Sequence, residues 1–254
     1  MFDEVGVRLL GPVEITRGRA VYALPGRRRK AVLVALALSV GETVSTDLLL
    51  EVVWDGRPPA TAANTLQSHV SFLRGRLGDR AAIVATTPGY RLRLGERAVD
   101  VGRLEGLLAA AGRAGDARDR AALLRRALGL WRDRPLSDLA GLAWFDQHAS
   151  RLERLRTRAR KAFADALLEL GEYPSAVSHL EEFVAEQPFD EETHGQLMVA
   201  LCRSGRAAEA LLTYHRLRGL LADELGVEPG RALRGIFDAI LRDDAPLWQP
   251  HRRL

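Results

Sequence analysis

The stretch that determines the fold runs from Thr61 to Gly78 and reads TAANTLQSHVSFLRGRLG. Four apolar residues recur in it at offsets of 4, 3 and 4, at Leu66, Val70, Leu73 and Leu77. This spacing puts the four side chains on one stripe of an α-helix, and glycine commonly follows the last residue of a helix. The sequence therefore predicts a helix from Thr61 to Leu77 with a single buried face.

The other faces of this predicted helix carry short hydrogen-bonding side chains. At about 100° per residue, they lie away from the apolar stripe, at Asn64, Gln67, Ser68 and Ser71, with Arg74 and Arg76 on the flanks. Amides can hydrogen-bond adenine edges, and hydroxyls can bond bases or phosphates. The pattern suits a helix in the major groove of DNA; the alternative is an ordinary polar face in contact with water.

Short strands are predicted on both sides of the helical region. Alternating apolar residues indicate three antiparallel strands between Val5 and Leu24. Downstream, residues 83–85 and 90–94 predict a hairpin with Pro88-Gly89 in its turn. The second strand directs Tyr90, Leu92 and Leu94 to one face and Arg91 and Arg93 to the other.

Two more helices are predicted between these strands. The apolar run from Ala31 to Val40 is too rich in Ala and Leu to favour a strand, and the basic residues 27–30 precede it. The next helix carries residues 48–54 and can be capped by Ser45 or Thr46. Strands, three helices and a basic hairpin follow each other in the order of a winged helix-turn-helix.

The composition is that of an ordinary globular protein, because 47% of the 254 residues are hydrophobic and 28% are charged. It excludes collagen-like, coiled-coil and wholly disordered chains. The single cysteine, Cys202, cannot form an internal disulfide, which fits a reducing compartment. No stretch reaches the roughly 18 apolar residues of a membrane span. We therefore expect a cytoplasmic, nucleoid-associated protein that does not contact a membrane.

Positive charge is concentrated in the first 98 residues. The whole chain has 37 Lys and Arg against 33 Asp and Glu, a net charge of +4. Residues 1–98 contain 14 basic and 9 acidic residues, a net charge of +5, and the remainder has a net charge of −1. Nucleic acids are bound by local basic patches, so this asymmetry favours DNA as the partner of the N-terminal part.

From Val101 onward the sequence is helical and contains a repeat. Leu167 recurs as Leu201 and Gly171 as Gly205, a spacing of 34 residues that equals the tetratricopeptide period. Other helices are predicted over residues 104–111, 120–131 and 149–170, with Trp131, Trp144 and Phe145 expected in the core. Such an array forms a platform for partners and supplies no chemistry of its own.

The sequence also resembles a known family. The run from Thr65 to Gly78, followed by Thr87-Pro88-Gly89-Tyr90-Arg91-Leu92, is similar to the recognition helix and wing of OmpR-type DNA-binding domains. Residues 5–243 as a whole resemble the Streptomyces antibiotic regulatory protein family. Three more runs carry this resemblance: Leu9-Leu10-Gly11-Pro12-Val13, Arg28-Arg29-Lys30-Ala31 and Leu225-Gly226-Val227-Glu228-Pro229-Gly230. The second domain of that family is the bacterial transcriptional activation domain.

The resemblance implies an activator of an antibiotic or secondary-metabolite gene cluster. It implies binding to promoter direct repeats, as a homodimer in tandem, and engagement of RNA polymerase and its sigma factor, with the loop 56–60 as a candidate polymerase contact. The candidate DNA contacts are Arg28, Arg29, Asn64, Gln67, Ser68, Ser71, Phe72, Arg74, Arg76, Thr87, Tyr90 and Arg91. Phe72 stands where OmpR-type helices usually carry a basic residue, and it is expected to meet a thymine methyl or to pack against the wing.

No enzyme motif is present. Lys30 and Lys161 both follow an arginine, so neither belongs to a phosphate-binding loop. The six histidines lack the close spacing of metal ligands, although His69 could contact a phosphate. We expect no catalytic residue, no metal and no cofactor.

We thus predict an α+β N-terminal winged helix-turn-helix domain over residues 1–97 and an all-α tetratricopeptide-like helical repeat domain over residues 98–243, with a tail over residues 244–254. The leading hypothesis is sequence-specific binding of double-stranded DNA. The competing hypothesis is a helical-repeat scaffold that binds a protein or a ligand without specific DNA binding.

Overall fold

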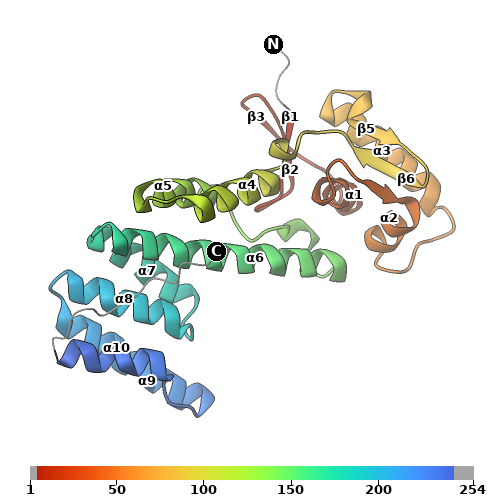
Figure 1. The fold of residues 1–254 in the computed structure, drawn as a ribbon. Coiled ribbons are helices and arrows are strands. Elements are labelled where there is room, and N and C mark those ends of the chain that lie inside the picture. Colours follow the sequence, from red (N-terminus) through yellow and green to blue (C-terminus); the bar gives the residue numbers. More distant parts are fainter. Residues whose placement is uncertain (1–4, 243–254) are drawn as a thin grey trace. The chain divides into compact units, whose positions relative to one another are not determined.

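A computed structural model of the chain describes residues 5–242, and the predicted tail at residues 244–254 lies outside them. The described residues form two compact units (Figure 1). The first extends to Leu108 and also includes Arg126–Arg156; the second contains Ala109–Arg125 and residues 157–242. The first unit thus combines residues that are widely separated in the sequence.

The first unit begins with a three-stranded antiparallel sheet in the order β1-β2-β3. Its strands are β1 (Val5–Arg8), β2 (Glu14–Arg17) and β3 (Ala20–Ala23), which confirms the three predicted strands. Val7 of β1 is paired with Ile15 of β2, and both side chains are buried in the core. Every residue of the edge strand β3 is exposed.

Three helices follow in the first unit: α1 (Arg27–Leu38), α2 (Thr46–Val53) and α3 (Ala62–Leu77). Of the two predicted caps of α2, Ser45 and Thr46, the structure has Ser45, whose Oγ accepts a hydrogen bond from Leu48 N at 3.2 Å. Gly78 ends α3 with a φ of 77°, in the left-handed region that glycine adopts without strain. These three helices confirm the predicted order.

The predicted start of α1 is wrong. The helix begins at Arg27, so the four basic residues 27–30 form its first turn and do not precede it. Gly26, with a φ of 85°, lets the chain turn into the helix directly after Pro25. The apolar run marks only the buried stretch from Ala31 to Ala37, because the first turn is more exposed to solvent.

A second sheet of the first unit has the order β4-β6-β5. The strands β5 (Ile83–Ala85) and β6 (Gly89–Leu92) form the predicted hairpin, and β4 (Thr43–Ser45) pairs with β6 on its other side. The sequence did not predict β4, which is too short to show an alternating pattern. A Cβ atom on Gly89 would lie only 2.0 Å from the carbonyl oxygen of Val44, so glycine permits these two strands to approach.

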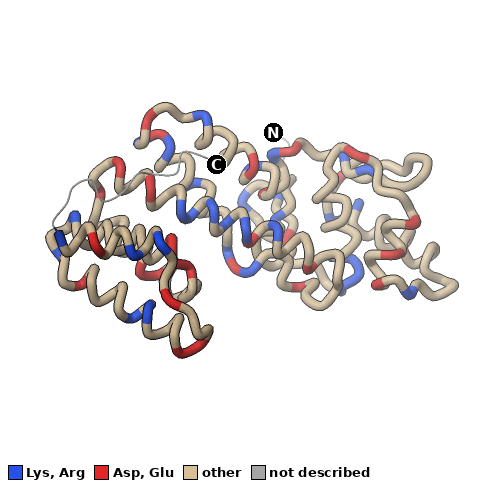
Figure 2. The backbone as a smooth tube through the Cα atoms, turned by 60° about the horizontal axis from the view of Figure 1, so that its bottom comes forward, with Lys and Arg blue, Asp and Glu red and all other residues tan. Residues whose placement is uncertain are grey.

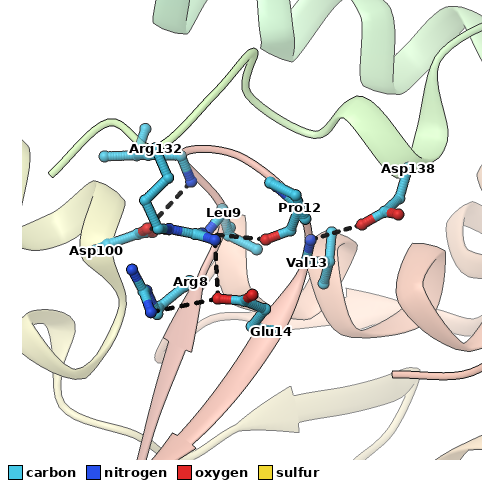
Figure 3. A network of polar contacts seen from close by, with 9 residues as sticks. Arg8, Leu9, Pro12, Val13, Glu14, Asp100, Arg132 and Asp138 are labelled. Atoms are coloured by element: carbon cyan, nitrogen blue, oxygen red, sulfur yellow. Dashed lines mark hydrogen bonds and ion pairs between the residues drawn. The ribbon is translucent and has the colours of Figure 1, made fainter. Parts of the chain in front are cut away.

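Asp100 holds the loop between β1 and β2, at the start of helix α4 (Asp100–Arg113). Its carboxylate accepts hydrogen bonds from Leu9 N at 2.8 Å and from Leu10 N at 3.0 Å, and the residue is 2% exposed (Figure 3). Burial raises the pKa of Asp100, and the bonds from the amides of Leu10 and Leu9 act in the opposite direction. The residue therefore satisfies two backbone donors that the sheet leaves without strand partners.

The same loop is held by residues that follow helix α5 (Ala117–Leu128). Arg132 donates to Glu14 Oε2 at 2.8 Å and to Pro12 O at 3.0 Å. Asp138 accepts a hydrogen bond from Val13 N at 2.7 Å and pairs with Lys30 Nζ at 2.6 Å. We call Arg8, Glu14, Lys30, Asp100, Arg132 and Asp138 the carboxylate network. Figure 3 labels all of them except Lys30.

The core of the first unit continues from the winged-helix elements into residues 126–156. Trp131 and Phe145 are buried in the same cluster as the α1 side chains, as predicted. Trp144 is partly buried against that cluster and contacts Phe145 edge to face. Helix α6 (Ala143–Glu169) begins in this unit.

The second unit contains the predicted helical repeat. Its helices α7 (Tyr173–Glu186), α8 (Glu191–Arg203), α9 (Ala207–Leu225) and α10 (Arg231–Leu241) follow the end of α6, and α8 contacts α7, α9 and α10. Gly171 and Gly205 have φ angles of 74° and 77°, so the repeated glycines occupy equivalent left-handed turns between paired helices. The repeat of 34 residues is therefore structural.

Carboxylate pairing also organises the second unit. Asp190 caps α8 by accepting a hydrogen bond from Thr193 N at 2.8 Å, and Lys161 Nζ lies 2.8 Å from its carboxylate. Burial alone would raise the pKa of Asp190, but the hydrogen bonds from Lys161 and Thr193 outweigh it and keep this pKa below its ordinary value. Blue and red segments both occur on the helices of this unit, so it carries cations and acids together (Figure 2).

Among residues 5–242, no helix is long and apolar enough to cross a membrane. Within the same range, no group of His, Cys, Asp and Glu side chains is arranged to hold a metal ion.

Candidate nucleic-acid interface

Helix α3 has one buried face and one exposed polar face. The predicted apolar stripe, from Leu66 to Leu77, is buried in the first unit. The side chains predicted to contact bases are all exposed, and they are Asn64, Gln67, Ser68 and Ser71. Ser68 Oγ donates to the carbonyl of Asn64 at 3.1 Å, one turn earlier, whereas Gln67 makes no hydrogen bond to a described residue.

Two of the predicted phosphate-binding arginines connect the structural elements around α3. Arg74 Nε donates to the carbonyl of Ile83 at 2.8 Å, which ties α3 to β5. Arg91 of the wing donates to Thr43 Oγ1 of β4 at 3.0 Å. Both acceptors are uncharged oxygens, so these hydrogen bonds orient each guanidinium and leave its positive charge without a neutralising carboxylate.

The structure gives Phe72 a role that the sequence did not predict. The guanidinium carbon of Arg29 lies 4.1 Å from the centre of the Phe72 ring, and that of Arg76 lies 5.2 Å from it. Both distances are within the range of cation–π attraction. Phe72 therefore holds two predicted phosphate contacts, one from the first turn of α1 and one from α3, beside each other.

The rings of Trp54 and His69 stack on each other near the first turn of α1. Their ring centroids are 6.5 Å apart, and the guanidinium carbon of Arg28 lies 5.4 Å from the Trp54 ring centre. Trp54 Nε1 and His69 Nε2 are buried and have no hydrogen-bond partner among the described residues. Burial lowers the pKa of His69, and the positive charges of Arg29 and Arg28 lower it further.

These groups line a cavity of about 620 Å³ in the first unit. The cavity is bounded by the first turn of α1, the end of α2 and the inner flank of α3, and its lining residues include Arg28, Arg29, Trp54, Thr65 and His69. No side chain caps the N-terminus of α1, whose first backbone N–H groups favour anions. Trp54 also belongs to the buried core of the first unit, and nothing in the local sequence pattern indicates that it lines a cavity as well.

The wing presents the remaining predicted contacts. Thr87 and Arg91 are exposed, and Tyr90 is half-buried with Leu94, against the core of the first unit. Leu92 is buried and Arg93 is exposed, so the predicted division of this strand into an apolar and a basic face is confirmed.

The basic first turn of α1 divides into two pairs with different partners. Lys30 is bound by Asp138, and Arg27 donates to the carbonyl of Ala140. Arg28 and Arg29 contact aromatic rings instead. We call Arg28, Arg29, Arg74, Arg76 and Arg91 the open arginines, because none forms an ion pair with a carboxylate among residues 5–242.

Comparisons with known proteins identify both parts of the chain. Residues 24–92 match the family described as "Transcriptional regulatory protein, C terminal", and residues 99–241 match the "Bacterial transcriptional activator domain". The chain belongs to the Streptomyces antibiotic regulatory protein family. Members of this family are transcriptional regulators.

Relatives in the family extend the match over almost the whole chain. Regulatory protein AfsR of Streptomyces griseus is 36% identical over 251 residues, which cover 98% of this chain but 26% of AfsR. Regulatory protein DnrI of Streptomyces peucetius is 32% identical, covering 94% of this chain and 92% of DnrI. The chain therefore spans about a quarter of one relative and most of the other.

A solved structure supports the fold. Mycobacterium tuberculosis EmbR, in complex with a low affinity phosphopeptide, is 32% identical and superimposes with a TM-score of 0.85. The match covers 95% of this chain and 66% of that one. An α/β winged-helix region followed by helices is therefore the architecture of this protein, as predicted.

Proposed function

We propose that the protein is a sequence-specific, double-stranded DNA-binding transcriptional activator of an antibiotic or secondary-metabolite gene cluster. In this proposal residues 1–97 bind DNA and residues 98–243 serve activation. The observation that supports it most directly is the exposed polar face of α3, bordered by the open arginines. Such a face can enter a major groove while the arginines bind phosphates on either side.

The basic cavity adds a second argument. Arg27, Arg28 and Arg29 line it and supply N–H donors, and Asp55 is the acid among its lining residues. A phosphate oxygen in the cavity would be stabilised by the guanidinium groups of Arg28 and Arg29. We therefore assign one backbone phosphate of the bound duplex to this cavity, with Trp54 and His69 beside it.

The salt dependence of duplex binding tests the role of the arginines. Arg76 is exposed and has no hydrogen bond to a described residue, so Arg76→Gln removes charge with little structural change. Each phosphate contact contributes about 0.9 to the slope of log K against log salt, and the variant should lose about that amount. Fluorescence anisotropy with a promoter duplex between about 50 and 200 mM salt measures this slope.

The matched control is Arg118→Gln, which removes an exposed arginine from α5 in the second unit. Its slope should equal that of the unaltered protein. An equal loss of slope in both variants would contradict a localised DNA interface. Absence of duplex binding at low salt would favour the competing scaffold hypothesis.

Base recognition requires a different measurement. Gln67 is exposed near the centre of the polar face, and its amide suits bidentate bonding to adenine. Gln67→Ala should change the preferred sequence at one position, with a discrimination loss of about 1–3 kcal/mol there. Selection from a randomised duplex library detects this change. A uniform loss of affinity at all sequences would contradict base contact.

Tandem binding and recruitment of RNA polymerase through its sigma factor complete the proposal. Two protomers on a direct repeat predict a footprint over two half-sites in the same orientation, and protection of an inverted repeat would contradict it. The loop 56–60 is exposed throughout and is the candidate polymerase contact. Substituting Arg57 in this loop should reduce transcription in vitro without reducing promoter binding, whereas loss of binding would contradict that assignment.

A further inference from the structure

The second unit contains a cavity of about 370 Å³ between α7, α8 and α9. Its floor is apolar, because Leu197, Leu201 and Leu217 line it and are at most 4% exposed. Leu212 stands at its edge with 51% of its surface exposed. The volume and the apolar lining are those of a site for a small organic molecule.

His194 supplies a polar group to this lining. It is 5% exposed, and its Nε2 lies 3.0 Å from the carbonyl of Pro188. A carbonyl oxygen only accepts, so Nε2 carries the proton and donates. Burial lowers the pKa of His194, so the ring is neutral near neutral pH. Its Nδ1 therefore has a free lone pair, and it has no hydrogen-bond partner among residues 5–242.

Charged groups surround the opening, and they differ in pairing. Glu209 accepts two hydrogen bonds from Arg206, at 2.6 and 2.8 Å, and Glu181 lies 3.8 Å from the same arginine. Arg216, which also lines the cavity, is exposed and forms no ion pair with a described carboxylate. Hydrogen bonds from Arg206, and to a smaller extent the charge of Arg216, lower the pKa of Glu209. Arg216 is therefore the arginine of the rim without a carboxylate within 4 Å among the described residues.

From these features we propose that the cavity binds a small amphipathic organic anion. Its apolar body occupies the floor formed by Leu197, Leu201 and Leu217, and its carboxylate or sulfonate pairs with Arg216. This site is separate from the proposed DNA interface, and its occupancy can be measured without DNA.

The probe for this proposal is 8-anilinonaphthalene-1-sulfonate, which combines an anion, an N–H donor and an apolar body. It is titrated into the full chain by fluorescence, and decanoate, decanol and decylamine are then used as competitors. We expect saturable binding and displacement by decanoate at lower concentration than by decylamine. Equal displacement by the acid and the amine would overturn the assignment to Arg216.

Three variants locate the binding site. Arg216→Gln should weaken probe binding about threefold to fivefold and remove the advantage of decanoate over decanol. Thr213→Trp places a large ring at the rim and should prevent binding, with folding checked by circular dichroism. Arg234→Gln removes an exposed arginine of α10 that does not line the cavity, and it should change nothing.

Arg216 is exposed, so we expect Arg216→Gln to fold whether or not Thr213→Trp does. Probe binding that is unchanged in Arg216→Gln would overturn the proposal, as would binding unchanged in a folded Thr213→Trp. The assay contains no DNA, so its result does not depend on whether the first unit binds DNA.

Discussion

The open arginines and the carboxylate network belong to the same compact unit and use the same residue type in opposite ways. Arg8 and Arg132 of the network share Glu14, at 3.3 and 2.8 Å. Arg29 and Arg76 of the other set share the ring of Phe72. A carboxylate neutralises a guanidinium, whereas an aromatic ring or a carbonyl orients it and leaves its charge available. The partner of an arginine therefore indicates its function better than a count of charges does.

Replacement of Asp100 by Ala is expected to have the largest effect on this comparison. The variant leaves the buried N–H groups of Leu9 and Leu10 without an acceptor and removes one of the two carboxylates near Arg132. We expect a loss of about 3 kcal/mol in the free energy of unfolding, measured with urea. Asp223→Ala, at an exposed position of α9, should cost almost nothing. Equal losses in the two variants would remove the distinction between network and surface acids.

A smaller effect is expected from Asp190→Asn in the second unit. The amide can still cap α8, but it loses the charge that pairs with Lys161, and about 1 kcal/mol of stability should be lost near neutral pH. The native pKa of Asp190 is depressed, so its contribution is present above the unfolded value and disappears as pH falls through the native one. Urea unfolding at several pH values measures the difference, and a difference that grows in acid would contradict the pairing.

Phe72→Leu tests whether the aromatic ring orients the open arginines. No charge is removed, so the salt slope of duplex binding should stay the same while affinity falls about threefold. Anisotropy titration at several salt concentrations separates the two quantities. Phe189→Leu, at a residue with 43% exposure in the second unit, is the matched control. A reduced slope would mean that Phe72 also fixes the number of phosphate contacts.

The smallest effect is expected for an exposed ion pair. Arg151 lies 2.8 Å from Glu105, with about half of each side chain in contact with solvent. Arg151→Gln should lower the free energy of unfolding by about 0.3 kcal/mol and leave duplex affinity unchanged. A double-mutant cycle with Glu105→Gln isolates the pair energy. A coupling energy above about 1 kcal/mol would show that solvent does not weaken this exposed pair relative to the pairs of the carboxylate network.

The parts of the fold that sequence analysis predicted are those with a local signal. Helix α3 has an apolar stripe and a terminal glycine, and the repeated Gly171 and Gly205 mark equivalent turns. The strand β4 gave no such signal, because its three residues acquire their role only by pairing with β6. Local patterns describe what one segment can do, not which distant segment completes it.

The candidate site shows the same limit. The exposure of Gln67 and Ser71 follows from helical periodicity and was predicted, and their contact with bases stays a prediction. The positions of Lys30 and Arg29 did not follow from the sequence, since adjacent basic residues of one helical turn contact Asp138 and Phe72 respectively. Asp138 is more than 100 residues away from Lys30 in the sequence, and no local pattern links the two.

The loop between β1 and β2 limits which segments of this protein can be exchanged with those of a relative. Its backbone donors at Leu9, Leu10 and Val13 are satisfied by Asp100 and Asp138, which lie in the segment that matches the activator family. A chimaera made by exchanging residues 1–97 alone would separate these donors from their acceptors. An exchange that carries Asp100 and Asp138 together with residues 1–97, and that has its boundary outside helices α4, α5 and α6, keeps these donors and their acceptors in the segment of one parent.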